Sequence, residues 1–273
     1  MRVYCILGDE RAYVLKSSLM FSSVLKQQGI KGSYVPFKVA PDQIGQALQS
    51  LKVLNITGAN ITVPYKETVI PHLDILSEGA NIIGAINTIV INGEELKGYN
   101  TNAIGFMDAM SSVGYDLEGK SALVIGTGGA ARAVVFVLNW MRTESIIVAG
   151  RNKEKTGELV NQLGGEAKSM QSLPEQPLSV DIVINATSVS SKDEAPEMDA
   201  LVQQLNLPNC DMIVDLNYGR TQNFWQDLAW AKDIRFMDGL TPLVYQARRT
   251  FSLWTGLQVP PENFLQALGE TEG

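Results

Sequence analysis

A glycine-rich stretch in the middle of the chain has the residue types of a phosphate-binding loop. Gly126-Thr127-Gly128-Gly129-Ala130-Ala131 follows an apolar run at 122–125 and leads into an apolar helical pattern at 130–141. In such a pattern the first glycine permits a tight turn, the second lets the backbone approach a pyrophosphate, and a small third residue lets helix and strand pack closely. Unpaired N–H groups and the positive helix end then face the anion. We predict a dinucleotide site here; the alternative is a glycine turn with a structural role only.

The next predicted strand, residues 145–149, bears on which dinucleotide is bound. An NAD site usually carries an acid at the end of this strand, where it accepts from the ribose hydroxyls. Here the strand is followed by Gly150-Arg151-Asn152-Lys153, which contains no acid. A guanidinium suits a 2′-phosphate through charge-assisted hydrogen bonds. We therefore expect NADP rather than NAD, unless Arg151 is a solvated loop cation.

A lysine near the N-terminus could supply a proton. Lys66 ends the string Asn60-Ile61-Thr62-Val63-Pro64-Tyr65-Lys66, in which the proline stops a predicted strand. We expect Lys66 to begin a helix over 65–76, at the carboxyl end of a strand, where ligands of open α/β sheets gather. Hydride transfer to a ketone makes an alkoxide, and a partly desolvated ammonium could protonate it. A lysine on the surface of a helix is the alternative.

Other catalytic groups are scarce. His72 is the only histidine, which argues against histidine triads and multi-histidine metal sites. Cys5 and Cys210 lie far apart and match no metal or redox spacing, so we expect two small buried apolar side chains. No metal site is predicted.

The elements that position these groups alternate between strands and helices, which predicts an α/β fold with mostly parallel sheets covered by helices. Predicted strands are residues 3–7, 33–39, 58–63, 85–91, 95–98, 122–125, 145–149, 181–185 and 212–215. Predicted helices are residues 15–26, 41–51, 65–76, 130–141, 154–163, 224–231 and 243–255. Asn92-Gly93 is typical of a hairpin turn. The polar loop at 189–197 is expected to be the least ordered stretch.

We place two domains by these motifs. Residues 1–102 form one α/β domain, to which 238–273 return, and residues 103–237 form the dinucleotide-binding domain. A closing helix at a cleft would let both domains share a site.

Composition excludes several classes of protein. The chain has 273 residues, 45% of them hydrophobic and 19% charged, which rules out disorder. Its net charge of −7 argues against nucleic acid or an anionic membrane as the main partner. The apolar runs are too short for a signal peptide or a membrane span. We expect a cytoplasmic protein, monomer or homodimer, whose partner is a small molecule.

Several strings together resemble the shikimate dehydrogenase family, in its order and spacing over essentially the whole chain. They are Gly58 to Lys66, Gly84-Ala85-Ile86-Asn87-Thr88, Asn100-Thr101-Asn102, Gly126 to Ala131, Asn185-Ala186-Thr187-Ser188, and Gln246 with Trp254-Thr255-Gly256. The resemblance implies NADP-dependent reduction of 3-dehydroshikimate to shikimate, a step of chorismate and aromatic amino acid biosynthesis. It also implies an N-terminal substrate domain, a Rossmann domain and a cleft between them.

The resemblance assigns roles residue by residue. Lys66 matches the catalytic lysine. The substrate's hydroxyls and carboxylate would be held by Thr62, Asn87, Tyr218 and Gln246, although Asn87 could be an ordinary turn residue and Tyr218 a rim residue. The cofactor surface would comprise Gly126, Thr127, Gly128, Gly129, Ala130, Gly150, Arg151, Asn152, Leu216 and Gly239.

Three positions depart from the family pattern. The acid paired with the lysine falls at Asn102, which can accept a hydrogen bond from Lys66 but carries no charge. Its absence should lower the lysine pKa and weaken or redirect proton transfer, with ligand binding retained. Asp9 or Glu10 could compensate.

The other two departures are at the N-terminus and near the nicotinamide. Of the Ser-x-Ser-Pro motif for the substrate carboxylate, only Ser17 matches, and Leu15 replaces the first serine; Lys16 could meet the carboxylate instead. Thr241-Pro242 replaces Gly-Met. The alternatives are a diverged member acting on quinate or another cyclic polyol acid, and a non-catalytic NADP-binding module.

Overall fold

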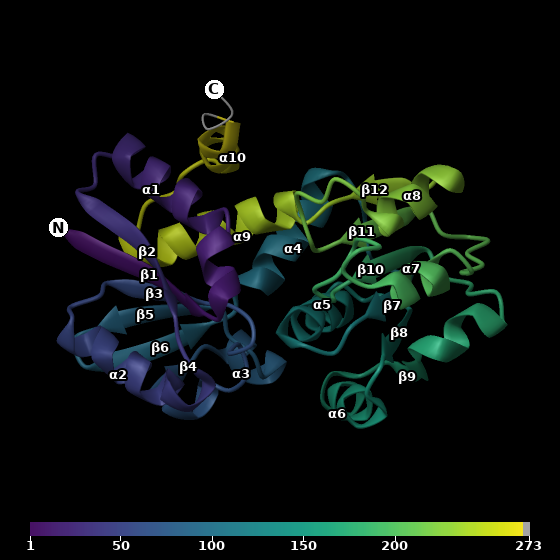
Figure 1. Cartoon of the computed structure of the whole chain (residues 1–273), viewed down its shortest axis with the longest axis horizontal. Helices are drawn as coiled ribbons and strands as arrows, with labels where there is room; N and C mark the ends of the chain where they lie inside the picture. Colours follow the sequence, from purple (N-terminus) through teal and green to yellow (C-terminus); the bar gives the residue numbers. More distant parts are fainter. Residues whose placement is uncertain (270–273) are drawn as a thin grey trace. The chain divides into compact units, whose positions relative to one another are not determined.

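The computed structural model describes residues 1–269. The chain divides into two units, each with its own sheet and core (Figure 1). Residues 1–105 and the described residues from Val244 onward form the first unit, and Phe106–Leu243 form the second. The α/β fold class is confirmed. No helix among the described residues is long and apolar enough to cross a membrane.

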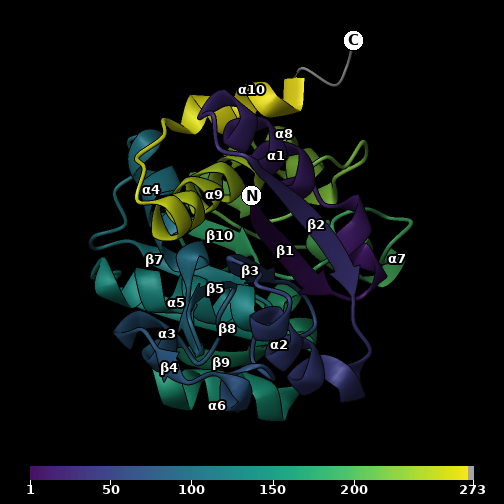
Figure 2. The ribbon, with the colours of Figure 1, turned by 90° about the vertical axis from the view of Figure 1, so that its left-hand side faces the viewer.

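The first unit contains a mixed six-stranded sheet in the order β2-β1-β3-β5-β6-β4. Its strands are β1 (Arg2–Gly8), β2 (Gly32–Lys38), β3 (Gly58–Ile61), β4 (Ile75–Leu76), β5 (Thr88–Asn92) and β6 (Glu95–Tyr99). Strand β1 pairs in parallel with β2 and β3, whereas β5 is antiparallel to β3 and β6. The predicted hairpin at Asn92-Gly93 is confirmed, with Gly93 at a φ of 60°. Figure 2 shows β1 and β2 side by side.

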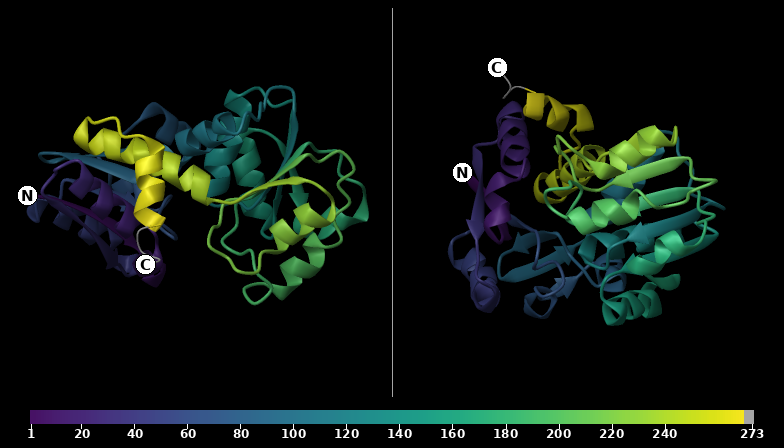
Figure 3. Two further views of the ribbon diagram at one scale, coloured as in Figure 1. Left: turned by 90° about the horizontal axis from the view of Figure 1, so that it is seen from above. Right: turned by 45° about the vertical axis from the view of Figure 1, so that its right-hand side comes forward.

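Helices cover both faces of this sheet because its central strand β1 is buried on both sides. They are α1 (Ser17–Gln27), α2 (Ile44–Val53), α3 (Glu78–Ile83), α9 (Leu240–Thr255), of which the first residues belong to the second unit, and α10 (Pro261–Gly269). Cys5 and Leu7 pack with α2, whereas Tyr4 stacks on Trp254 of α9 at 4.7 Å between ring centroids. Helix α10 lies beside α1 (Figure 3).

The predicted helix over 65–76 is wrong. The segment forms turns, a short 3-10 helix, η3 (Ile70–His72), and then strand β4. The N–H of Ile70 donates to Glu67 O at 3.2 Å and that of His72 to Val69 O at 3.0 Å, which are bonds of three-residue spacing. Pro71 explains the difference, because it has no N–H for an α-helical bond and disfavours helical backbone at Ile70.

Two further 3-10 helices, η1 (Glu10–Val14) and η2 (Pro41–Gln43), precede α1 and α2. Helix α1 therefore begins at Ser17, later than the predicted start at 15.

The second unit contains a parallel six-stranded sheet in the order β12-β11-β10-β7-β8-β9. Its strands are β7 (Ser121–Ile125), β8 (Ser145–Gly150), β9 (Glu166–Ser169), β10 (Ile182–Asn185), β11 (Met212–Asp215) and β12 (Arg235–Met237). The chain runs outward from β7 through β8 to β9 and then returns to β10 on the other side of β7. This is the strand order of a Rossmann domain, whose ligands bind where the order reverses.

The helices of this unit are α5 (Gly129–Trp140), α6 (Lys153–Leu163), α7 (Pro196–Val202), α8 (Phe224–Ala231), the 3-10 helix η4 (Met170–Glu175), and the later residues of α4 (Thr101–Ser112). Helices α7 and α8 pack with η4 over one apolar face of the sheet, through buried Met198, Trp225 and Leu173. Strand β9, strand β12 and helices α4 and α7 were not predicted.

Candidate active site

The glycine loop follows β7 at the reversal point of the second sheet. Gly126 has a φ of 121°, and a Cβ there would lie 2.9 Å from the carbonyl carbon and oxygen of Ala186, which follows β10. Glycine is therefore required where the loops after β7 and β10 meet. Helix α5 begins at Gly129, and the first bond at this end runs from Arg132 N to Gly128 O. The N–H groups of Gly129, Ala130 and Ala131 thus precede it and remain available to an anion.

The predicted adenosine end of the cofactor surface follows β8. Gly150 is buried, and a Cβ there would lie 2.4 Å from Thr156 Oγ1 and 2.7 Å from Thr127 Cγ2. Arg151 is exposed and makes no ion pair with any described residue. Asn152 caps helix α6, because its Oδ1 accepts from Lys155 N at 3.0 Å. The donors of this turn fit an anionic phosphate, and the turn carries no acid.

Leu216 and Gly239 lie together after β11 and β12. A Cβ on Gly239 would lie 2.1 Å from Leu216 O, and Gly239 N donates to Asn217 O at 2.9 Å. Tyr218 follows on the same loop and lines a cavity of about 610 Å³ with Arg220 and Thr241. The glycine loop does not line this cavity.

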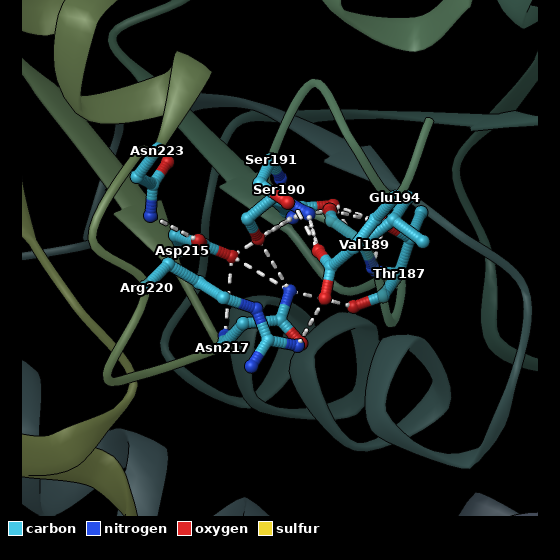
Figure 4. A network of polar contacts seen from close by, with 10 residues as sticks. Thr187, Val189, Ser190, Ser191, Glu194, Asp215, Asn217, Arg220 and Asn223 are labelled. Carbon is cyan, nitrogen blue, oxygen red and sulfur yellow. Dashed lines mark hydrogen bonds and ion pairs between the residues drawn. The ribbon is translucent and has the colours of Figure 1, made fainter. Parts of the chain in front are cut away.

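A buried carboxylate organises the loops after β10 and β11 (Figure 4). Asp215, at the end of β11, is fully buried and accepts from Asn185 Nδ2 at 2.8 Å and Asn223 Nδ2 at 2.7 Å. The backbone N–H and the Nδ2 of Asn217 also donate to it, at 3.1 and 3.0 Å. Burial raises the pKa of Asp215 in spite of these donors. The carboxylate thereby fixes the loop that carries Leu216 and Tyr218.

The polar loop at 189–197, expected to be the least ordered stretch, is linked by hydrogen bonds to its own backbone and to the loop after β11. Glu194 accepts from the N–H of Ser190 at 2.9 Å and from that of Ser191 at 3.2 Å, and it pairs with Arg220 at 2.8 Å. Ser190 also accepts from Asn217 Nδ2 at 2.7 Å. The polar side chains, which suggested solvent exposure, instead satisfy the backbone of the loop.

In the first unit, Lys66 lies in the turn after β3. Its backbone oxygen accepts from Ile86 N at 2.8 Å, which brings the turn beside the residue that precedes Asn87. The side chain is half-buried, and within residues 1–269 its Nζ makes no hydrogen bond or ion pair. Burial lowers the pKa of Lys66 to about 8. The direction agrees with the sequence expectation, but the cause is burial, and Lys66 does not begin a helix.

Asn87 and Asn102 are joined by a hydrogen bond. Asn87 Nδ2 donates to Asn102 Oδ1 at 3.0 Å and to Thr101 Oγ1 at 2.8 Å, and the N–H of Thr101 donates to Asn87 Oδ1 at 2.7 Å. The expected bond from Lys66 to Asn102 is absent from the described residues, and the Asn102 oxygen accepts from Asn87 instead. Asn100 caps helix α4 by accepting from Ala103 N at 3.1 Å.

Gln246 joins this cluster through three threonines. Its Nε2 donates to Thr101 Oγ1 at 3.1 Å and Thr250 Oγ1 at 2.8 Å. Thr88 lies 3.0 Å from the hydroxyl of each of these threonines. The structure thus brings together Asn87, Asn102 and Gln246.

Thr62 and Ser17 are placed separately. Thr62 follows β3, and its N–H donates to Leu7 O at 3.0 Å. A Cβ at Gly8 would lie 2.3 Å from the Thr62 methyl group, so only glycine leaves room for Thr62 there. Ser17 is buried at the start of α1, and no described residue bonds its hydroxyl. Lys16 lies directly before the helix.

Both acids of the first loop pair with cations other than Lys66. Asp9 binds the guanidinium of Arg11 through both oxygens, at 2.6 to 3.0 Å, and this partner lowers the pKa of Asp9. Glu10 pairs with Lys38 at 3.1 Å. Among the described residues neither acid pairs with Lys66, so these contacts give no support to compensation for Asn102.

Sequence reasoning missed Asp215 and the three threonines. Asp215 ends one predicted strand and Asn185 ends another. Two parallel strands that both end in a polar residue were a signal that these side chains meet at one edge of the sheet. Thr250 offers no signal of this kind, since 162 residues separate it from Thr88. Within the described residues, no group of three or more His, Cys, Asp or Glu side chains could hold a metal ion.

Three family models match successive parts of the chain. The shikimate dehydrogenase substrate binding domain matches residues 7–89, shikimate / quinate 5-dehydrogenase matches 108–226, and the shikimate 5′-dehydrogenase C-terminal domain matches 239–268.

Curated relatives and solved structures agree with these matches. The chain is 36% identical over 253 residues to shikimate dehydrogenase (NADP(+)) of Desulforamulus reducens, covering 89% of this chain and 87% of the relative. It is also 36% identical to that of Geobacillus kaustophilus, covering 98% and 97%. Shikimate 5-dehydrogenase of Thermus thermophilus, solved in complex with NADP(H) and shikimate, aligns with a TM-score of 0.85 at 31% identity, covering 99% of each chain.

Proposed function

Because the chain belongs to the shikimate dehydrogenase family, we propose that it catalyses the reversible NADP-dependent reduction of 3-dehydroshikimate to shikimate. In the family this oxidoreductase step leads to chorismate and the aromatic amino acids. The observation in this chain that carries the proposal is Lys66, a half-buried amine with a lowered pKa and no partner among the described residues. Such an amine is suited to exchange a proton with a substrate oxygen.

The second unit binds the cofactor in this proposal. The amides of Gly129 and Ala130 meet the pyrophosphate, with Gly126, Thr127 and Gly128 forming the turn. Gly150, Arg151 and Asn152 surround the adenosine phosphate, and the guanidinium of Arg151, which has no ion pair among the described residues, favours NADP over NAD. Leu216 and Gly239 complete the surface. Bound NADPH supplies the hydride.

The first unit holds and protonates the substrate. The substrate's hydroxyls and carboxylate are assigned to Thr62, Asn87 and Gln246, with Ser17 at the start of α1, and the resemblance gives Tyr218 the same role. Lys66 donates a proton to the oxygen that becomes a hydroxyl, and accepts it in the reverse direction. Asn102 keeps its place beside Asn87 and contributes no charge.

The proposal includes a cytoplasmic location, since a freely exchanging nucleotide cofactor must be regenerated by other reactions there. It also includes a monomer or homodimer, which sedimentation would distinguish.

The test is turnover of shikimate with NADP⁺, followed by the absorbance of the reduced nicotinamide. The natural chain should turn over, and Lys66→Met should lose about 10²–10⁴-fold in kcat, the contribution of a general acid or base. Lys31→Met, which removes an exposed lysine of the same unit, is the matched control and should retain full activity.

Three results would redirect the assignment. Equal turnover by Lys66→Met and the natural chain would overturn the role of Lys66. Turnover of quinate in preference to shikimate would identify a diverged member of the family. Binding of NADP with no turnover of either acid would indicate a non-catalytic module.

A further inference from the structure

We propose that Asn102 presents an amide N–H to the substrate and forms, with Lys66, a donor-only pair that selects the oxo form of the substrate over its hydroxyl form. This inference rests on the proposed function, because it takes the ligand to be the substrate of that site. It concerns whether the side chain at position 102 donates or accepts a hydrogen bond. A carboxylate only accepts, whereas a carboxamide also has an N–H donor.

The orientation of Asn87 is fixed by the backbone. A backbone N–H can only donate, so the Asn87 atom 2.7 Å from Thr101 N must be the oxygen, Oδ1. The other terminal atom is then Nδ2, and its two hydrogens are used by Thr101 Oγ1 at 2.8 Å and by Asn102 at 3.0 Å. Asn87 is buried, which favours full use of both hydrogens.

The orientation of Asn102 follows from that of Asn87. Because Asn87 Nδ2 can only donate, the Asn102 atom that it meets must be the acceptor, Oδ1. Asn102 Nδ2 is therefore the free end of the side chain, and no described residue accepts from it. An aspartate in this place would instead keep one oxygen on Asn87 and offer the other as an acceptor.

Lys66 adds donors of the same kind. Its backbone is bonded to Ile86, next to Asn87, and its charged amine has three N–H donors and no acceptor. A ketone oxygen can accept from both groups and has no hydrogen of its own to place. A hydroxyl oxygen can accept the same two bonds, but its own hydrogen finds no acceptor on either group, and an unmatched buried donor weakens binding by about 5- to 100-fold.

Asn102→Asp is a suitable test variant because the position tolerates a carboxylate. Asn102 is the second residue of α4, where a negative charge is favoured by the helix N-terminus. The introduced carboxylate would still accept from Asn87. The matched control is Asn92→Asp, which makes the same change at the exposed hairpin of the same unit.

The first measurement is the affinity of 3-dehydroshikimate and of shikimate for the full chain without cofactor, so that neither reacts. The natural chain and Asn92→Asp should bind the ketone about tenfold more tightly than the alcohol, and Asn102→Asp should reduce this ratio about tenfold. If the ketone-to-alcohol affinity ratio of Asn102→Asp lies within about twofold of that of the natural chain, the inference is overturned. This holds even when both ligands bind and separate assays with cofactor show turnover.

The second measurement needs no ligand. In the natural chain, the side-chain amide hydrogens of Asn87 should exchange with solvent more slowly than those of Asn102, by about tenfold or more. The opposite order would show that Asn102 Nδ2 is engaged and would overturn the inference regardless of activity. Failure of both acids to bind or react would overturn the proposed function, and the inference with it.

Discussion

At the scale of a single residue, the proton-transfer role proposed for Lys66 depends on the burial of its amine. Its amine has lost enough water for its pKa to fall to about 8, close to the pH at which an acid–base catalyst works in both directions. The resemblance implies a carboxylate paired with it, and at that position this chain has Asn102. The amine therefore titrates without a counter-charge among the described residues.

We expect the two directions of the reaction to depend oppositely on pH. Reduction needs the protonated amine, so kcat/KM for the ketone should be constant below pH 8 and fall about tenfold per unit above it. Oxidation needs the neutral amine, so kcat/KM for the alcohol should rise up to about pH 8 and then level off. Initial rates between pH 6 and 10 measure both profiles.

Asn102→Asp provides the check on this assignment. A carboxylate near the amine favours its charged form, so the pKa of Lys66 should rise and both profiles should move to higher pH. Profiles that are flat across the range, or that do not move in Asn102→Asp, would show that another group carries the proton.

At the scale of elements, the start of α8 depends on Asn223 in two ways. Its Oδ1 caps the helix by accepting from Trp225 N at 2.9 Å, while its Nδ2 donates to the buried Asp215. Asn223→Ala should therefore lower the free energy of unfolding by about 2–4 kcal/mol, the sum of a lost cap and a lost donor to a buried charge. Denaturant titration measures this loss.

Asn152→Ala is the matched control for the cap alone. Asn152 caps α6 with the same Oδ1 geometry but is exposed and bonds no carboxylate, so its loss should cost only about 1 kcal/mol. Because burial raises the pKa of Asp215, the excess loss in Asn223→Ala should shrink as the pH is lowered and this carboxyl takes up a proton. Equal losses in the two variants at neutral pH would mean that Asp215 does not depend on Asn223.

The sequence correctly predicted those elements that form through interactions between residues close together in the chain. The glycine loop, the Asn92-Gly93 hairpin and the strand–helix alternation of 122–163 are present because each depends on neighbours in the chain. The segment 65–76 was misread because its apolar spacing suits a helix, although Pro71 prevents one.

Long-range contacts explain what the sequence did not reveal about the site. Lys66 was singled out from its place after a strand, and Asn87, Asn102 and Gln246 were named from the resemblance. The Thr88, Thr101 and Thr250 hydroxyls that join Asn87 to Gln246 come from β5, α4 and α9. Nothing in a one-dimensional pattern indicates that these three residues meet. Likewise, the Asn102 oxygen accepts from Asn87, a partner that only the fold brings to it.

At the scale of the whole molecule, the two units differ in how they use the chain. The second unit is continuous from Phe106 to Leu243, whereas the first takes its last part from residues beyond 244. That part supplies Trp254, which stacks on Tyr4, donates to Ile89 O at 3.0 Å and occupies the space left by Gly58. A single side chain late in the sequence thus completes the core of the N-terminal sheet.

We therefore expect Trp254→Ala to loosen the first unit selectively. Removing a buried tryptophan should cost about 3–5 kcal/mol, and hydrogen exchange should accelerate in β1 and β3 while β7 and β10 keep their protection, because those strands belong to the other core. Trp230→Ala is the matched control: that indole is 68% exposed and its loss should change stability by no more than about 0.5 kcal/mol. Adenosine 2′,5′-bisphosphate should still bind Trp254→Ala, since its site belongs to the second unit in the proposed function. Faster exchange to the same extent in both sheets would mean that the two cores unfold as one, and that Trp254 supports the whole chain.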